Sequence, residues 1–262
     1  MHEPPHPDRS DGGFKKAESD PASSTLMKLY SLKLTSVICP KCELTFATPV
    51  AKMPKLSSES RVETDLHRVL PDAAIRASLV AMCPECLYTW WLSAFKNHYF
   101  LPEMLPDTPP VENAKKFGHA VLSGRKNGAH SLDRAIIALN GYWCAREDFQ
   151  PAGKWLELSA RELYEALNDD SWNGNRGRYQ FIMGEVLRLM GEFHDAVRFY
   201  DLVDRRSVLP KELIEHQIVQ AKNGDSTPTL LPPHIIEDIF LPKPQVVPAV
   251  APTEVVFAAA VV

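Results

Sequence analysis

The chain has 262 residues, of which 45% are apolar and 24% are charged, and its formal net charge is −4. This is the composition of an ordinary globular protein, and it excludes a fibrous or wholly disordered chain. The balance of 29 basic against 33 acidic side chains also disfavours a strong nucleic-acid binder, which would need a basic surface.

The two ends of the chain differ from its middle. Four of the 22 prolines lie within residues 1–25, and seven lie between Pro228 and Pro252. Segments without apolar periodicity cannot offset the entropy of ordering, so we predict a disordered tail at 1–25 and a proline-rich, apolar tail at 225–262. The first residues lack the cationic start and apolar core of a secretory signal, which favours a cytoplasmic protein. The apolar run 246–262 is shorter than the roughly 20 residues of a membrane-spanning helix.

Alternating apolar and polar residues predict short strands beside each cysteine pair. Residues 30–38 alternate and lead to Cys39, residues 44–50 continue the pattern, and residues 75–81 alternate just before Cys83. Each cysteine pair is therefore expected at a turn between strands. Residues 54–71 have little periodicity and are expected to form an ordered loop.

The aromatic residues after the second cysteine pair follow a helical spacing. Trp90, Trp91, Phe95 and Tyr99 fall on one face of a helix, which predicts a short amphipathic helix packed on the cysteine-bearing part. Four prolines between residues 102 and 110 then interrupt regular structure. We therefore predict a zinc-ribbon-like module with its flanking helix at 26–101 and a linker at 102–129.

Two matching Cys-Pro-x-Cys motifs are the sharpest features of the chain, and they contain four of its five cysteines: Cys39, Cys42, Cys83 and Cys86. Two residues between a pair of thiolates allow one tight turn to point both sulfurs at a single ion. Two such turns supply the tetrahedral four-sulfur shell that structural zinc favours. The 40 residues between Cys42 and Cys83 exceed the usual separation in a ribbon, so the turns must meet across an insertion.

Other uses of these cysteines remain open. The alternatives are four reduced thiols in the core, a thioredoxin-like redox pair, and a rubredoxin-like iron site that uses the same four sulfurs. Many such metal sites carry Gly after the second cysteine, whereas Glu43 and Leu87 stand here. Zinc in a structural role is the preferred interpretation, because four protein ligands leave no open position for water.

Other candidate residues are expected to serve packing. Cys144 lies on an apolar helical stripe, as a buried thiol does. His67 and His98 lie near the cysteines in sequence and could replace one as a ligand, but with four cysteines available each is expected to be a surface or packing residue. Trp90 and Trp91 are expected to pack rather than to stack on bases. The chain has no glycine-rich phosphate loop or nucleophile elbow, and no enzyme activity is predicted.

Residues 130–224 carry five helical patterns separated by short connections. The spacing of apolar residues predicts helices over 132–146, 151–168, 181–190, 193–200 and 210–222. Short connections between helices imply antiparallel hairpins. Gly184, Gly191, Ala196 and Tyr200 stand at the offsets of small, turn and aromatic residues in the 34-residue tetratricopeptide repeat. The predicted fold class is α+β: a small β-rich zinc-ribbon-like module followed by an all-α, tetratricopeptide-like region, with disordered tails.

These motifs together resemble a known family. The run Val37-Ile38-Cys39-Pro-Lys-Cys42, the strand ending in Cys83-Pro-Glu-Cys86, and the helical segments 183–191 and 193–200 resemble the bacterial domain-of-unknown-function family numbered 2225. The resemblance covers roughly residues 28–222. It implies a zinc-ribbon-like module joined to tetratricopeptide-like helices, and it implies no established activity.

Two functions compete on this basis. The leading hypothesis is a protein-interaction scaffold, in which a structural zinc site supports a helical repeat that binds a protein or peptide partner. The alternative is a nucleic-acid-binding or regulatory protein that uses Trp90, Trp91, Lys41, Lys52 and Lys55. The nearly balanced charge of the chain favours the first.

Overall fold

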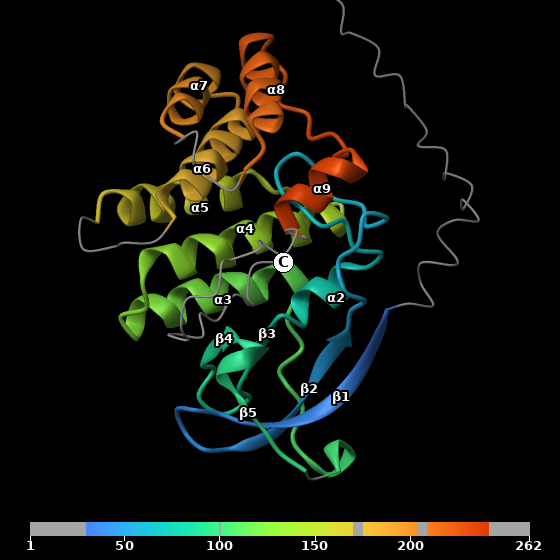
Figure 1. Ribbon diagram of the computed structural model, residues 1–262. Coiled ribbons are helices and arrows are strands. Elements are labelled where there is room, and N and C mark those ends of the chain that lie inside the picture. The colour runs from blue at the N-terminus through green and yellow to red at the C-terminus, as the bar shows by residue number, and fades with distance from the viewer. Residues whose placement is uncertain (1–29, 100, 170–174, 204–208, 241–262) are drawn as a thin grey trace, which may run out of the picture.

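The computed structural model describes residues 30–99, 101–169, 175–203 and 209–240. The tail predicted at 1–25 and the part of the C-terminal tail from residue 241 onward lie outside these residues. The fold is α+β, with a small antiparallel sheet region followed by helices, as the sequence predicts. The strands lie at one end of the molecule and the helices stack away from them (Figure 1).

The sheet region consists of two small antiparallel sheets. Strands β1 (Ser31–Ile38) and β2 (Thr45–Lys52) form a hairpin, and β5 (Lys96–Asn97) adds to the other side of β1. Strands β3 (Val80–Met82) and β4 (Thr89–Trp91) form a second hairpin. Each hairpin turn contains one Cys-Pro-x-Cys motif, which confirms the placement of the cysteine pairs.

Two local predictions in this region are wrong. The helix predicted over residues 90–99 is instead β4, a short 3-10 turn η1 (Leu92–Ala94) and β5. Neighbouring strand residues point to opposite sides, so Trp90 packs against Gly124 while Trp91 points toward a cavity. The strand predicted over 75–81 begins as a helix, α2 (Ala73–Ala77), because the Asp72 side chain accepts a hydrogen bond from the Ala74 amide at 2.8 Å and caps it.

The helices predicted within 130–224 are present. They are α4 (Ser131–Glu147), α5 (Gly153–Leu167), α6 (Arg176–Met190), α7 (Phe193–Asp201) and α8 (Lys211–Lys222). Consecutive helices in this series pack against each other. The α6 helix ends at Gly191, whose φ of 85° is the left-handed conformation that glycine adopts without strain.

The segment predicted as a linker, 102–129, is not one. After a 3-10 turn η2 (Pro102–Met104), it forms α3 (Asn113–Lys126), which packs against α4 and β4. Phe117, Ala120 and Val121 stand at i, i+3 and i+4 and are buried. The prolines at 102–110 do stop regular structure, but this apolar stripe after them forms a core helix.

The predicted C-terminal tail also begins with ordered structure. Within 225–240 lies α9 (Pro233–Phe240), whose Ile235, Ile236 and Ile239 are buried. Just before it, the carbonyls of Asp225 and Thr227 accept hydrogen bonds from Arg188 of α6. The isoleucine spacing of one and three residues forms a helical face, which outweighs the proline content of this segment.

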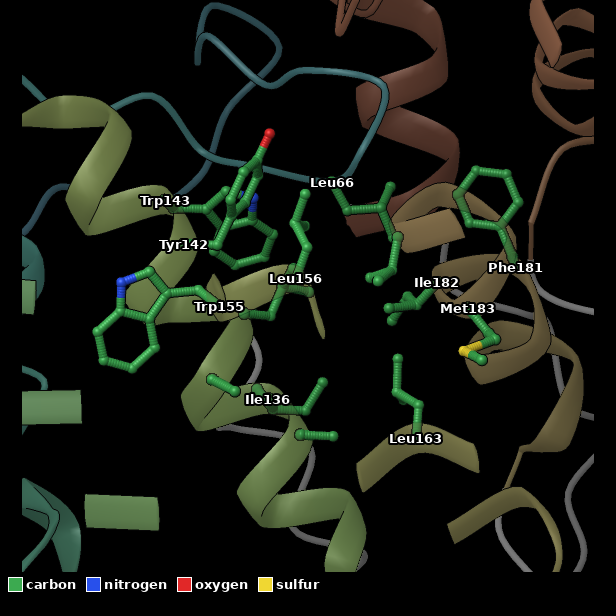
Figure 2. Close-up of a cluster of buried hydrophobic side chains, with 14 of the residues drawn as sticks. Leu66, Ile136, Tyr142, Trp143, Trp155, Leu156, Leu163, Phe181, Ile182 and Met183 are labelled. Carbon is green, nitrogen blue, oxygen red and sulfur yellow. The ribbon is translucent and has the colours of Figure 1, made fainter. Parts of the chain in front are cut away.

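The segment between β2 and α2, residues 53–72, leaves the sheet region and packs on the helices; we call it the connecting segment. The Leu231 amide donates to the Val62 carbonyl at 2.7 Å, and the Thr64 amide donates to the Thr229 carbonyl at 2.8 Å. These bonds join the connecting segment to residues 229–231, which form the approach to α9. Figure 2 shows Leu66 of the connecting segment among side chains of α4, α5 and α6.

The sheet region and the helices share one hydrophobic core. Val62, Ala77 and Val80 belong to the same buried cluster as Ile137 and Phe181 of the helices. A second, smaller buried cluster surrounds Cys39 and Cys83 and consists of Val37, Phe46, Ala81 and Phe95. The boundaries predicted at 101 and 129 therefore do not separate independent cores. No helix among the described residues is long and apolar enough to cross a membrane.

The contact between Gly184 and Tyr200 permits a stability test. An ideal Cβ at position 184 would lie 2.5 Å from Tyr200 Cε1, and the Tyr200 hydroxyl, which donates to Glu185, holds the ring in place. We expect Gly184→Ala to lower the free energy of unfolding by about 1 to 3 kcal/mol, although Gly to Ala usually stabilises a helix. Urea unfolding measures the change.

The matched control is Gly153→Ala in α5, where an added Cβ would meet no atom within 4 Å. This variant should be as stable as the parent or more stable by up to about 1 kcal/mol. If both alanines proved equally harmless, the Tyr200 ring would be free to move and the close approach would not constrain the helix pair.

Candidate metal centre

The two cysteine motifs fold into matching turns. At the first, the Cys39 amide donates to the Leu44 carbonyl at 2.9 Å, and the Glu43 amide donates to the Cys39 carbonyl at 3.0 Å. At the second, the Cys83 amide donates to the Tyr88 carbonyl, and the Leu87 amide donates to the Cys83 carbonyl. The same hydrogen bonds at both turns give the two cysteine pairs the same geometry.

Both turns require a left-handed residue directly after the second cysteine. Glu43 has a φ of 62° and Leu87 a φ of 56°, in the region that favours glycine. A side chain there costs on the order of 1 kcal/mol. Glu43 and Leu87, which stand where many such sites have glycine, therefore add strain, but the turns still form.

The four sulfurs converge. The Sγ atoms of Cys39 and Cys86 are 3.6 Å apart, those of Cys42 and Cys83 are 3.5 Å apart, and all four lie within 4.8 Å of one another. A tetrahedron of zinc–sulfur bonds of about 2.3 Å has edges of about 3.8 Å. These distances are far longer than a disulfide bond. The four predicted ligands thus lie close enough to hold a metal ion, and their chemistry is compatible with zinc.

The environment of the thiols separates them into an inner and an outer pair. Cys39 and Cys83 are buried, whereas Cys42 and Cys86 are exposed. Burial raises the pKa of Cys83 to about 12, and the Leu44 amide lowers the pKa of Cys42 below its usual value. Because a metal binds thiolates, its binding would release a proton from a group such as Cys83.

Small apolar and polar contacts hold the two turns together. Phe46 and Phe95 meet edge to face, with ring centroids 5.8 Å apart, beneath the cysteines. The Thr108 hydroxyl donates to the Met82 carbonyl at 2.7 Å, and the Thr89 amide donates to the Ser123 hydroxyl of α3. Residues that follow the second cysteine pair, namely Phe95, Thr108 and Ser123, thus contact the two hairpins.

The other candidate residues have varied fates. Cys144 is buried, and its thiol faces the Ala73 carbonyl, as expected for a core cysteine. The His98 amide donates to the Ser36 carbonyl across the sheet. His67, expected to be a surface or packing residue, is buried and lies in a cluster of charged groups.

This second cluster was not predicted from the sequence. Each ring nitrogen of His67 faces a carboxylate, with Nδ1 2.7 Å from Glu63 and Nε2 2.9 Å from Glu147. The remaining members are Asp65, Arg76 and Arg146. Alternating polar residues Glu63-x-Asp65-x-His67 were the only available signal. Their partners follow about 80 positions later, on α4.

The cluster is better suited to ion pairing than to metal binding. Glu63, Asp65 and His67 lie within 4.8 Å of one another, as ligands of one ion would. However, the Arg146 guanidinium already forms ion pairs with Glu63 at 2.9 Å and with Asp65 at 3.4 Å. Trp143 stacks on the His67 ring and donates its Nε1 proton to Asp65.

The ion pairs lower the pKa of two of the three carboxyl groups in the cluster. Burial raises the pKa of Glu147, but hydrogen bonds and charge from His67 and Arg76 outweigh it, and the pKa is lower than usual. The same balance, with His67 and Arg146, lowers the pKa of Glu63. Asp65 is the exception, because complete burial raises its pKa.

Comparison of the chain with family models, with curated proteins and with solved structures finds no match. The resemblance to the family numbered 2225 therefore stays a prediction. Any function proposed for the chain depends on the geometry of its described residues.

Substitution of single cysteines tests the metal centre. We expect purified protein to contain about one equivalent of zinc, and Cys83→Ser to lose it and unfold the sheet region, because a structural zinc site contributes on the order of 10 kcal/mol. Elemental analysis and circular dichroism measure both effects.

Cys144→Ser is the control for this test, since it changes a buried thiol that lies outside the cluster. It should keep its zinc and its chelator resistance. Metal-free protein with reduced thiols and an intact fold would contradict the assignment of the ligands, as would equal damage by both substitutions.

Glu147→Gln tests the buried ion pairs. A lowered pKa means that Glu147 stabilises the fold above the ordinary glutamate pKa, and that this contribution is lost as the pH falls through the lowered value. We expect the variant to lose about 3 to 5 kcal/mol at neutral pH, because Arg76 is left buried without its carboxylate. Its deficit relative to the parent should shrink as the pH falls below the ordinary glutamate pKa and through the lowered pKa of Glu147.

Glu112→Gln serves as the comparison, because Glu112 forms an exposed pair with Lys115. Surface pairs contribute about 1 kcal/mol or less, so this substitution should change the free energy of unfolding very little. A Glu147→Gln deficit that did not depend on pH would mean that packing, not charge, accounts for the loss.

Proposed function

We propose that the chain is a zinc-stabilised protein-interaction scaffold. The convergence of four cysteine sulfurs supports a structural zinc ion, because such a shell is complete and leaves no position for a substrate or a catalytic water. In this proposal Cys39, Cys42, Cys83 and Cys86 hold the ion, and the zinc-ribbon-like module positions the helices.

The helical part supports a tetratricopeptide-like interpretation in one pair of helices. Gly184 of α6 lies against the Tyr200 ring of α7, and Ala196 is fully buried. Those are the close-packing positions of the repeat, and Gly191 provides the turn. Stacked hairpins of this kind commonly bind peptides.

The face of α4 and α6 that points toward the connecting segment is already occupied. Trp143 and Arg146 of α4 bond to Asp65, and Ile236 of α9 belongs to the same buried core. A partner therefore needs another surface. In our proposal that surface is the groove between α3 and α5, which we call the α3–α5 groove.

The α3–α5 groove combines an apolar floor with a basic rim. Val121 and Trp155 are buried at its base, and Leu122 is 57% exposed. Its rim carries Lys115, Arg125, Lys154, Arg161 and Glu157. Lys115 pairs with Glu112 and Arg125 with buried Glu162, so the cationic excess of the rim rests on Lys154 and Arg161. Its volume is about 510 Å³, enough for side chains of a bound segment.

Charge complementarity selects the partner. An acidic peptide segment with one or two apolar anchors would place its anchors against Leu122 and Trp155 and its carboxylates near the rim. Trp90, required by the nucleic-acid alternative, packs against Gly124 of α3 and does not line that groove. The peptide is therefore the occupant we propose.

Fluorescence anisotropy with synthetic peptides tests the proposal. A labelled acidic peptide with leucine anchors should bind the intact chain, and its lysine-substituted counterpart should not. Leu122→Asp and Arg161→Glu should each weaken binding about tenfold or more, because they remove an anchor contact and reverse a rim charge.

Val219→Asp on α8 is the matched control, since Val219 is an apolar residue exposed to 52% outside the groove. It should bind the acidic peptide like the parent, and all variants should keep their zinc. Equal binding of the acidic and basic peptides would contradict the proposal. So would tight binding of a single-stranded oligonucleotide that falls steeply with salt and is lost in Arg161→Glu.

A further inference from the structure

A cavity of about 250 Å³ lies between the sheet region and the helices. Val50 and Trp91 come from the strands, Leu139 and Trp143 from α4, and Phe240 from the end of α9. Figure 2 shows Trp143, Ile136 and Ile182 of this region. Most of the wall is apolar, so the cavity favours a hydrocarbon body.

Two arginines on this wall have no carboxylate partner among the described residues. Arg68 is only 8% exposed, and its guanidinium contacts the Pro54 carbonyl and the Tyr30 hydroxyl, while its Nε is buried without a hydrogen bond. Arg178, at the start of α6, is partly exposed, but its Nε is buried without a hydrogen bond. A buried guanidinium without an anion is costly.

The other polar groups of the wall are already satisfied. Arg76 bonds to Glu147, to Asn140 and to the Arg68 carbonyl. Asp65 accepts from Trp143, and the Ser78 hydroxyl donates to the Ile75 carbonyl. Ser93 is exposed to solvent. The buried side-chain groups of the wall that lack a hydrogen bond are thus cationic and belong to Arg68 and Arg178.

We propose that this cavity binds a small monocarboxylate with an apolar body. The hydrocarbon would contact Leu139, Ile182 and Phe240, and the carboxylate would meet a guanidinium, which matches its planar geometry. A cavity of about 150 Å³ holds a benzene molecule, so this one has room for a medium-length chain or a substituted ring. The site is separate from the α3–α5 groove and does not depend on the proposed function.

Isothermal titration calorimetry with octanoate, octanol and octylamine tests the site on the intact, zinc-loaded chain. The three probes share one hydrocarbon chain and differ in charge. Octanoate should bind at least tenfold more tightly than either of the others. Arg178→Gln should lower octanoate affinity about tenfold, because a charge-assisted bond is replaced by a neutral one, and Arg68→Gln should do the same.

Two further variants keep the test decisive. Arg198→Gln removes an exposed arginine on α7 whose ion pair is with Asp195, and it should leave octanoate binding unchanged. Ala51→Phe fills the cavity from β2 and should abolish binding while zinc content and helicity are retained. Octanol binding as tightly as octanoate, octanoate binding that survives Ala51→Phe, or no binding of octanoate would each overturn the proposal.

Discussion

The convergence of four cysteine sulfurs from two distant turns is the constraint on which the remaining structure depends. Cys42 and Cys83 are separated by 40 residues, yet their sulfurs are 3.5 Å apart. The entropy of closing a loop rises only slowly with its length, so a long insertion between the turns is tolerated. The connecting segment uses this length to contact α4 and the approach to α9 before the chain returns to the second turn.

That path explains why the sheet region and the helices share a core. The connecting segment contributes Val62 and Leu66 to the helical cluster, and α3 links β4 to α4. Buried ion pairs fix the same junction, with Glu63 and Arg76 on one side and Arg146 and Glu147 on the other. Apolar burial supplies most of the driving force there, while the charges select one arrangement, since misplacing either side would leave a buried charge unpaired.

Local patterns predicted what depends on local physics. The strands of the β1–β2 hairpin, the cysteine turns and the helices from α4 to α8 all follow from periodicity and spacing near each residue. The aromatic run at 90–99 misled because its spacing fits a helix, whereas pairing of β4 with β3 decides its conformation. The network around His67 and the cavity at Arg68 were beyond reach, because their partners come from segments far apart in the chain and only the tertiary fold brings them together.

The alternation of buried and exposed sulfurs has a kinetic consequence. Each turn contributes one inner thiol, Cys39 or Cys83, and one outer thiol, Cys42 or Cys86. An incoming chelator or competing ion meets the two outer sulfurs first, and these belong to different turns. For the metal ion that we propose at this site, exchange would therefore start at the solvent face, with both hairpins still held by their inner sulfurs. Such an ion would be replaced stepwise, without a prior global opening of the hairpins.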